Sequence, residues 1–306
     1  MQIYRIPFQA MACACEVVIA AEEEQAMFAI AQEAIAEVKR IESKYSRYRA
    51  DSIVSRINAQ AGGEAVLCDA ETSSLLDYAQ ALHAASDGLF DITAGILRRA
   101  WNFKLAQVPA AADLAALCAL IGWHKVERSA DSLRLPAAGM EIDFGGFGKE
   151  YAADRAAALL LDRGATHGYV NLGGDIRVLG PKPDGQAWIM GIQDPRQQEK
   201  IVASIPVPEG ALATSGDYER YIEVAGQRYC HILNPHTGMP VQYWRSISVR
   251  APLASLAGSC TTIAMLKEEQ GLAYLKAAGV AYLAIDQQGE MHMHAPPRVA
   301  DAIVAR

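Results

Sequence analysis

The chain of 306 residues has no excess of positive charge and no long apolar run. Its net charge is −7 and its lysines and arginines are dispersed, which argues against nucleic acid as a partner. A transmembrane helix needs about 18 or more consecutive apolar residues, and no such run occurs. The N-terminus also shows no cationic leader followed by an apolar segment. We therefore expect a cytoplasmic protein without a membrane span.

Cysteine is also scarce, with six residues in the whole chain. Six are too few for a disulfide scaffold in a chain of this length, and none of them forms the Cys-x-x-Cys spacing of a metal site. Cys13 and Cys15 lie two positions apart in a strand-like run, so both should point to the same face, where we interpret them as small core residues.

The overall amino-acid composition is that of an ordinary globular protein, with 51% hydrophobic and 21% charged residues. Strands and helices come in runs instead of strict alternation, which favours an α+β fold with mixed sheets flanked by helices. We expect a single unit over residues 1–306, with an N-terminal helical layer at about 22–121. Predicted helices lie at about 22–44, 51–58, 72–85, 111–121, 253–267 and 268–278, and predicted strands at 2–7, 13–20, 125–128, 132–135, 139–143, 167–171, 175–179, 187–193, 200–206, 219–224, 228–233, 245–250, 280–285 and near 290.

The segment from Glu141 to Asp175 carries the strongest chemical signal. It reads EIDFGGFGKEYAADRAAALLLDRGATHGYVNLGGD, with a Gly-Gly-Phe-Gly-Lys turn directly before a predicted helix. A glycine turn lets backbone N–H groups approach a phosphate, and a helix N-terminus adds partial positive charge. Lys149 lies in this turn and adds a full charge. The alternative is that the glycines only make tight turns.

Four further clusters of polar residues fall between predicted elements, where side chains tend to surround a site. In the first of them Asp51 and Ser52 are explained by helix capping, whereas Tyr48 is not easily explained as a core residue. His231 is either a structural hydrogen-bonding residue or a base. The clusters are residues 45–58, 86–93, 213–241 (ATSGDYER followed by HILNPHTGMPV) and 251–265 (APLASLAGSCTTIAM).

Taken in this order, the motifs resemble those of the FAD:protein FMN transferase family, also called ApbE-like proteins. AMACACEVVI is similar to the family's AMGT opening, IDFGGFGKEYAADRA to its IDLGGIAKGYAVDRA, and GYVNLGGD, ATSGDYER and HILNPHTGMPV match family motifs almost completely. The resemblance implies a T-fold-related architecture. It also implies FAD bound in a cleft, Mg²⁺ on its diphosphate, and transfer of FMN to a threonine of an acceptor flavoprotein with release of AMP.

The resemblance also implies roles for individual residues. Tyr48 and Phe90 would pack on the rings of FAD, and Lys149 would contact its phosphates. Gly146 would offer a carbonyl to the metal and Thr262 a hydroxyl, while His231 would take the proton from the acceptor threonine. No motif identifies the acceptor or the oligomeric state. The residues expected to contact FAD are Met11, Tyr48, Leu89, Phe90, Asp91, Asp143, Lys149 and Leu233.

Two positions depart from the family pattern. Where the family has an aspartate ligand for Mg²⁺, four residues before the threonine, this chain has Gly258, and no acidic residue occurs between Ala251 and Lys267. Where the family has Lys-Gly, this chain has Lys149 followed by Glu150. Glu150 either supplies charge from the facing helix turn or is a solvated helix start, and we interpret it as the latter. Loss of the aspartate should weaken Mg²⁺ binding. The alternatives to transfer are therefore an FAD-binding relative with impaired catalysis and an FAD diphosphate hydrolase.

Overall fold

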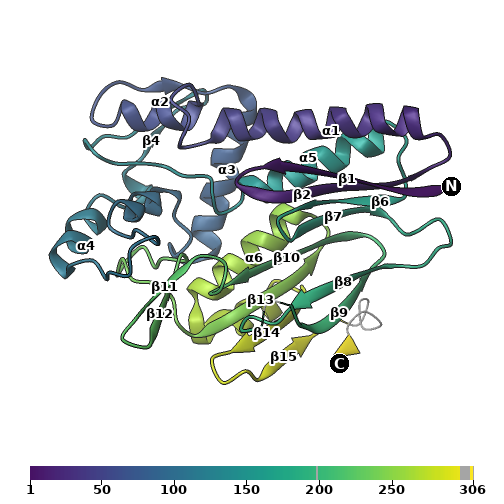
Figure 1. Ribbon diagram of the computed structural model, residues 1–306. Coiled ribbons are helices and arrows are strands. Elements are labelled where there is room, and N and C mark those ends of the chain that lie inside the picture. Colours follow the sequence, from purple (N-terminus) through teal and green to yellow (C-terminus); the bar gives the residue numbers. More distant parts are fainter. Residues whose placement is uncertain (198, 297–303, 306) are drawn as a thin grey trace.

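An eight-stranded sheet forms the centre of the protein, with helices on one face and a β-hairpin on the other (Figure 1). The computed structural model describes residues 1–197, 199–296 and 304–305. Along β2, Val17 and Ile19 pack into the cluster under the helices, while Val18 packs into the cluster under the hairpin. This alternation is the period of two expected for a strand buried on both faces.

The strands of the central sheet follow the order β1-β2-β6-β7-β10-β13-β14-β15. Each pairing described in this sheet is antiparallel. Its strands are β1 (Gln2–Ala10), β2 (Cys13–Ala21), β6 (Gly168–Leu172), β7 (Asp175–Gly180), β10 (Gly210–Gly216), β13 (Trp244–Ala251), β14 (Ala281–Asp286) and β15 (Met291–His294). The smaller sheets contain β8 (Trp188–Gln193), β9 (Ile201–Val207) and β16 (Val304–Ala305), then β3 (Val66–Leu67), β4 (Glu127–Arg128) and β5 (Ser132–Arg134), and finally β11 (Tyr221–Val224) and β12 (Gln227–Cys230).

Helices α1, α5 and α6 pack on the sheet, and α2, α3 and α4 gather at one end of the molecule (Figure 1). None of the helices within the described ranges is long and apolar enough to cross a membrane. The α-helices are α1 (Glu24–Tyr45), α2 (Ile53–Ala59), α3 (Ala70–Ala85), α4 (Ala111–Cys118), α5 (Gly148–Asp162), α6 (Ala254–Leu266) and α7 (Gly271–Ala277), and the 3₁₀ helices are η1 (Ile92–Arg99), η2 (Trp123–Lys125) and η3 (Glu268–Gln270).

The structure confirms the predicted α+β class and the opening hairpin, but it corrects two predictions. The strand predicted at 139–143 is absent, because the Ile142 backbone bonds to the Asn58 side chain and the Asp143 N–H bonds to the Ile92 carbonyl instead of a strand. Strand β10 was not predicted, since its sequence, GALATSG, has few β-branched residues. Its place in the middle of the sheet, not its own propensity, holds it extended.

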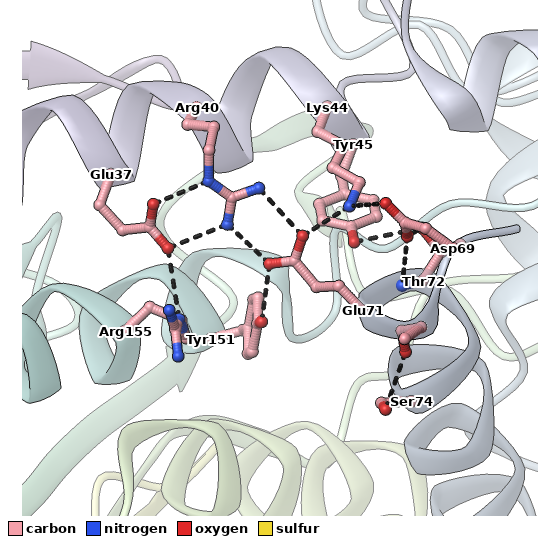
Figure 2. Close-up of polar contacts among 11 residues, drawn as sticks. Glu37, Arg40, Lys44, Tyr45, Asp69, Glu71, Thr72, Ser74, Tyr151 and Arg155 are labelled. Atoms are coloured by element: carbon pink, nitrogen blue, oxygen red, sulfur yellow. Dashed lines mark hydrogen bonds and ion pairs between the residues drawn. The ribbon is translucent and has the colours of Figure 1, made fainter.

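A network of charged side chains fastens α1 and α3 to α5 (Figure 2). Arg40 lies 2.7 Å from both Glu37 and Glu71, and Lys44 lies 2.6 Å from Glu71. The Tyr151 hydroxyl of α5 donates to Glu71 over 2.9 Å. The network borders a cavity of about 820 Å³ in which these charges are already paired with one another. The network therefore has a structural role, which is to hold α5 in place, and no ligand is needed to explain its charges.

Helix α6 is fixed to α5 by a carboxylate at its N-terminus. Asp154 of α5 accepts hydrogen bonds from Ala254 N at 2.8 Å, from Ser255 N at 2.9 Å and from Ser255 Oγ at 2.7 Å. A carboxylate there satisfies N–H groups that lack a partner within the helix and offsets the helix dipole. Asp154 thus acts as the cap that the chain's own preceding residue, Leu253, does not provide.

We expect Asp154→Ala to destabilise the protein by about 1–3 kcal/mol, because three hydrogen bonds at the start of α6 are lost together. Urea unfolding followed by circular dichroism measures the change. Asp162→Ala, at an exposed position on the same helix, is the control and should change stability by no more than about 0.5 kcal/mol. Equal stability of the two variants would contradict the capping role.

Candidate functional site

The glycine turn before α5 is supported from below by aromatic rings. Phe147 is fully buried and stacks on Phe90 with ring centroids 6.3 Å apart. A Cβ atom at Gly146 would lie 2.8 Å from the ζ carbon of Phe90, so only glycine fits there without movement. The Gly146 carbonyl accepts no hydrogen bond from the described part of the chain. It is therefore free to face a ligand.

The extended segment leading into the turn is held by residues of the first polar cluster. Asn58 donates to the Ile142 carbonyl at 3.0 Å and accepts from the Ile142 N–H at 2.7 Å. Arg47 lies 2.6 Å from Glu141 and 3.1 Å from Asp143. Residues 45–58 thus hold in place the segment 141–143, which leads into the glycine turn.

A second glycine turn, between β6 and β7, lies against the first. Gly173 and Gly174 both have positive φ, 62° and 98°. A Cβ atom at Gly173 would lie 2.8 Å from the Cys13 sulfur and 3.8 Å from Lys149 Nζ. The turn leads directly into Asp175, whose Oδ2 lies 2.6 Å from Lys149 Nζ. This ion pair joins the two glycine turns of the segment from Glu141 to Asp175.

Three ionisable groups lie together at this junction, with Asp175 and Glu150 buried and Lys149 partly exposed. Burial raises the pKa of Asp175, while Lys149 opposes the rise. Burial alone would lower the pKa of Lys149, but the carboxylates of Asp175 and Glu150 raise it overall. Burial raises the pKa of Glu150, and the neighbouring Asp175 carboxylate raises it further. The interpretation of Glu150 as a solvated helix start is wrong, because the residue is only 8% exposed and turns inward between α5 and α6.

Helix α6 presents small and hydroxylated residues to the same region. Thr261 Oγ1 donates to the Gly258 carbonyl at 2.8 Å, and Ser215 Oγ of β10 lies 2.8 Å from Thr261 Oγ1 and 3.4 Å from Thr262 Oγ1. Thr262 follows Gly258 by one helical turn, so both lie on the same side of α6. Ser215 was not singled out from the sequence, although its motif, ATSGDYER, was.

His231 follows β12 and is partly buried. Burial, together with Arg98 and Arg220, lowers the pKa of its imidazole to about 4. Lys149 lowers this pKa further. The Nδ1 atom of His231 is buried and has no hydrogen-bond partner within the described ranges. At neutral pH the imidazole is therefore uncharged and able to accept a proton.

The remaining predicted FAD contacts fall into exposed and buried groups. Tyr48 is 79% exposed, which is unusual for a tyrosine and suits a ring that packs on a ligand. Met11 lies in the β1–β2 turn with φ of 52°, and its N–H donates to Glu42 at 2.6 Å. Phe90 is only 5% exposed and supports the turn from beneath.

Asp91 is engaged within the protein. Its carboxylate accepts from the backbone N–H and hydroxyl of Thr93 and from the Trp123 N–H at 2.9 Å. Leu89 is partly buried against the main core, and Leu233 forms an isolated bridge with Pro240. The structure thus places Gly146 against Phe90 and Lys149 against Gly173 and Asp175, whereas the Asp91 carboxylate faces the protein interior and Tyr48 extends into solvent. Thr262 lies one turn after Gly258, which packs against Glu150.

Comparison with known proteins agrees with this geometry. A family model described as the ApbE family matches residues 11–284. The chain belongs to this family. It is 30% identical over 256 residues to a protein of Vibrio cholerae named FAD:protein FMN transferase, covering 81% of the chain and 76% of that protein. A Klebsiella pneumoniae protein of the same name is 33% identical over 209 residues, covering 67% of the chain and 64% of that protein.

A solved structure shares the fold closely. The ApbE protein of Thermotoga maritima superposes with a TM-score of 0.90 at 30% identity, covering 98% of both chains. The family resemblance inferred from the motifs is thus confirmed, and so is the ApbE-like architecture.

We expect Gly146→Ala to destabilise the protein by about 1–3 kcal/mol, because its Cβ would press on Phe90 at 2.8 Å. Gly148→Ala is a matched control in the same turn, since its Cβ would lie 3.7 Å from Phe144 Cβ, an ordinary contact. Its effect should stay within about 0.5 kcal/mol. Thermal unfolding of both variants measures the difference, and a neutral Gly146→Ala would show that the turn is not tightly packed on Phe90.

Proposed function

We propose that this chain transfers the FMN moiety of FAD to a threonine hydroxyl of an acceptor flavoprotein and releases AMP. The observation that carries the proposal is the Lys149–Asp175 ion pair, which joins two glycine turns at the N-terminus of α5. His231 adds a buried Nδ1 that has no hydrogen-bond partner within the described ranges. Together they combine an anion-binding helix end with a proton acceptor. The names of the curated relatives support the same reaction.

Binding of FAD would use two parts of the candidate site, the N-terminus of α5 and the exposed loop that carries Tyr48. Lys149 and the α5 N-terminus would meet the diphosphate, which carries about two negative charges at neutral pH. The exposed ring of Tyr48 would pack on a flat part of the ligand. Met11, Leu89, Phe90, Asp91, Asp143 and Leu233 would complete the surroundings, with Asp91, Asp143 and Phe90 acting largely by holding the backbone around FAD in place.

The transfer step forms one bond and breaks one bond at phosphorus. The threonine oxygen would attack the phosphorus attached to riboflavin, and the diphosphate bond to the AMP phosphate would break. The hydroxyl proton would pass to the neutral imidazole of His231, and AMP would leave with the electron pair of the broken bond. A positioned base of this kind contributes about 10²–10⁴-fold to a rate.

Mg²⁺ would offset negative charge on the diphosphate when bound. The free Gly146 carbonyl and the Thr262 hydroxyl are oxygen donors of the kind this ion takes. A buried carboxylate, Glu150, packs against Gly258, one turn before Thr262 on α6, and its Oε2 has no partner within the described ranges. The residues present therefore fit the ion.

We expect the purified chain, incubated with FAD, Mg²⁺ and a threonine-containing acceptor peptide, to give a peptide heavier by FMN and an equal amount of AMP. His231→Gln should lower the rate by about 10²-fold or more while leaving FAD affinity unchanged, because the base is lost without a change in charge at neutral pH. Mass spectrometry and chromatography of AMP measure both products.

Three results would separate the alternatives. AMP and free FMN formed without acceptor would indicate FAD hydrolysis. Stoichiometric bound FAD with no product under any metal would indicate an impaired flavin-binding protein. Equal rates for wild type and His231→Gln would remove His231 from the mechanism while leaving transfer itself intact.

We expect the acidic limb of the pH–rate profile to lie near pH 4 instead of near 6.5, because the pKa of His231 is lowered to about 4. The same shift makes the fold less stable as pH falls from 6.5 to 4, since the unfolded chain takes up the proton first. Circular dichroism at each pH therefore has to accompany the rate measurement. A limb near 6.5 in folded protein would contradict the neutral, buried imidazole.

A further inference from the structure

The side chain of Glu150 on α5 fills the space in front of Gly258 on α6. A Cβ atom at Gly258 would lie 2.5 Å from Glu150 Oε1, 2.6 Å from its Cγ and 2.8 Å from its Cδ. Real Cβ atoms do not approach other atoms this closely. No side chain can therefore stand at 258 while Glu150 keeps this conformation, and the glutamate fills the place where a side chain from α6 would begin.

The Glu150 carboxyl group is buried beside that of Asp175. Glu150 is 8% exposed, and its Oε2 has no hydrogen-bond partner within the described ranges. The nearest cation, Lys149, pairs with Asp175 at 2.6 Å. Two carboxylates thus share one ammonium group, which leaves one negative charge in excess when both are ionised. A buried charge of this kind is costly unless a cation or further donors approach it.

Two neutral oxygen donors lie close to these positions along the chain. Thr262 lies one helical turn after Gly258 on the same side of α6, and Gly146 lies in the glycine turn, four residues before Glu150 and just before α5 begins. The Gly146 carbonyl accepts no hydrogen bond within the described ranges, and the Thr262 hydroxyl has only a long contact of 3.4 Å with Ser215. A carboxylate, a carbonyl and a hydroxyl are the oxygen ligands that Mg²⁺ takes alongside phosphate.

We infer that Glu150 supplies from α5 the metal-binding carboxylate that the family motif supplies from the position of Gly258 on α6. The chain has exchanged a Gly–Asp pair, glycine on α5 and aspartate on α6, for a Glu–Gly pair with the same single carboxylate between the helices. The two departures from the family pattern are one compensated change. This inference rests on the proposed Mg²⁺-dependent function.

The exchange predicts that a change at either position alone disturbs the arrangement. Gly258→Asp would place its Cβ 2.5 Å from Glu150 Oε1 and would add a second carboxylate to a region that already has an excess. Glu150→Gly would remove the carboxylate and leave a space between α5 and α6. Only the double variant Glu150→Gly/Gly258→Asp restores one carboxylate together with the space that it needs.

The test measures the binding of Mn²⁺, used in place of Mg²⁺, to the protein in the presence of FAD, by electron paramagnetic resonance of the free ion. Glu150→Gln keeps the shape of the side chain and removes its charge, so we expect Mn²⁺ affinity to fall by at least about tenfold. FAD affinity measured without metal should stay within about threefold of the wild type. The double variant should bind Mn²⁺ within about threefold of the wild type, and Gly258→Asp alone should not bind it more tightly.

Glu290→Gln is the matched control, because Asp286, Glu290 and His292 form a separate cluster of potential ligands near the protein surface. Its Mn²⁺ affinity should equal that of the wild type. Unchanged affinity in Glu150→Gln, or loss in Glu290→Gln instead, would overturn the inference, as would a wild type that binds FAD but no Mn²⁺. The proposed function fails separately, if the wild type binds no FAD or yields no flavinylated peptide.

Discussion

The ion pair between Lys149 and Asp175 is the interaction on which the arrangement of the site depends. It joins the turn at the start of α5 to the turn between β6 and β7, and both turns are glycine-rich because backbone and side chains approach closely there. The pair also determines the electrostatic surroundings of Glu150, because the Lys149 ammonium group beside it is already paired with Asp175. A lysine that already has a carboxylate partner cannot fully neutralise a second one.

The packing of the helices around α5 then positions the other residues of the candidate site. Asp154 caps α6 from α5, so the two helices are held at a fixed register, and Gly258 packs against Glu150 near the start of α5. Thr262 lies one turn further along the same side of α6. The network around Glu71 holds α1 and α3 to the opposite side of α5 (Figure 2). The candidate site is thus built mainly on rigid elements, with Tyr48 on an exposed loop as the main exception.

Local patterns were enough to predict the opening hairpin, the long helix α1, the glycine turn before α5 and the family itself. They failed where distant residues decide the outcome. The segment at 139–143 bonds to the Asn58 side chain instead of a strand, and β10 is extended because β7 and β13 flank it. The burial of Glu150 could not be read from its helix-start position, because its cause is the missing side chain of Gly258 on another helix.

The central claim is that one carboxylate between α5 and α6 binds the metal, whichever helix carries it. A crystal of the protein soaked with FAD and Mn²⁺, with data collected at the manganese absorption edge, locates the ion directly. We expect an anomalous peak bound by a Glu150 carboxylate oxygen at about 2.1–2.2 Å, with Thr262 and the Gly146 carbonyl beside it. A peak on the FAD diphosphate with Glu150 still unliganded, or a peak only at Asp286 and His292, would contradict the claim.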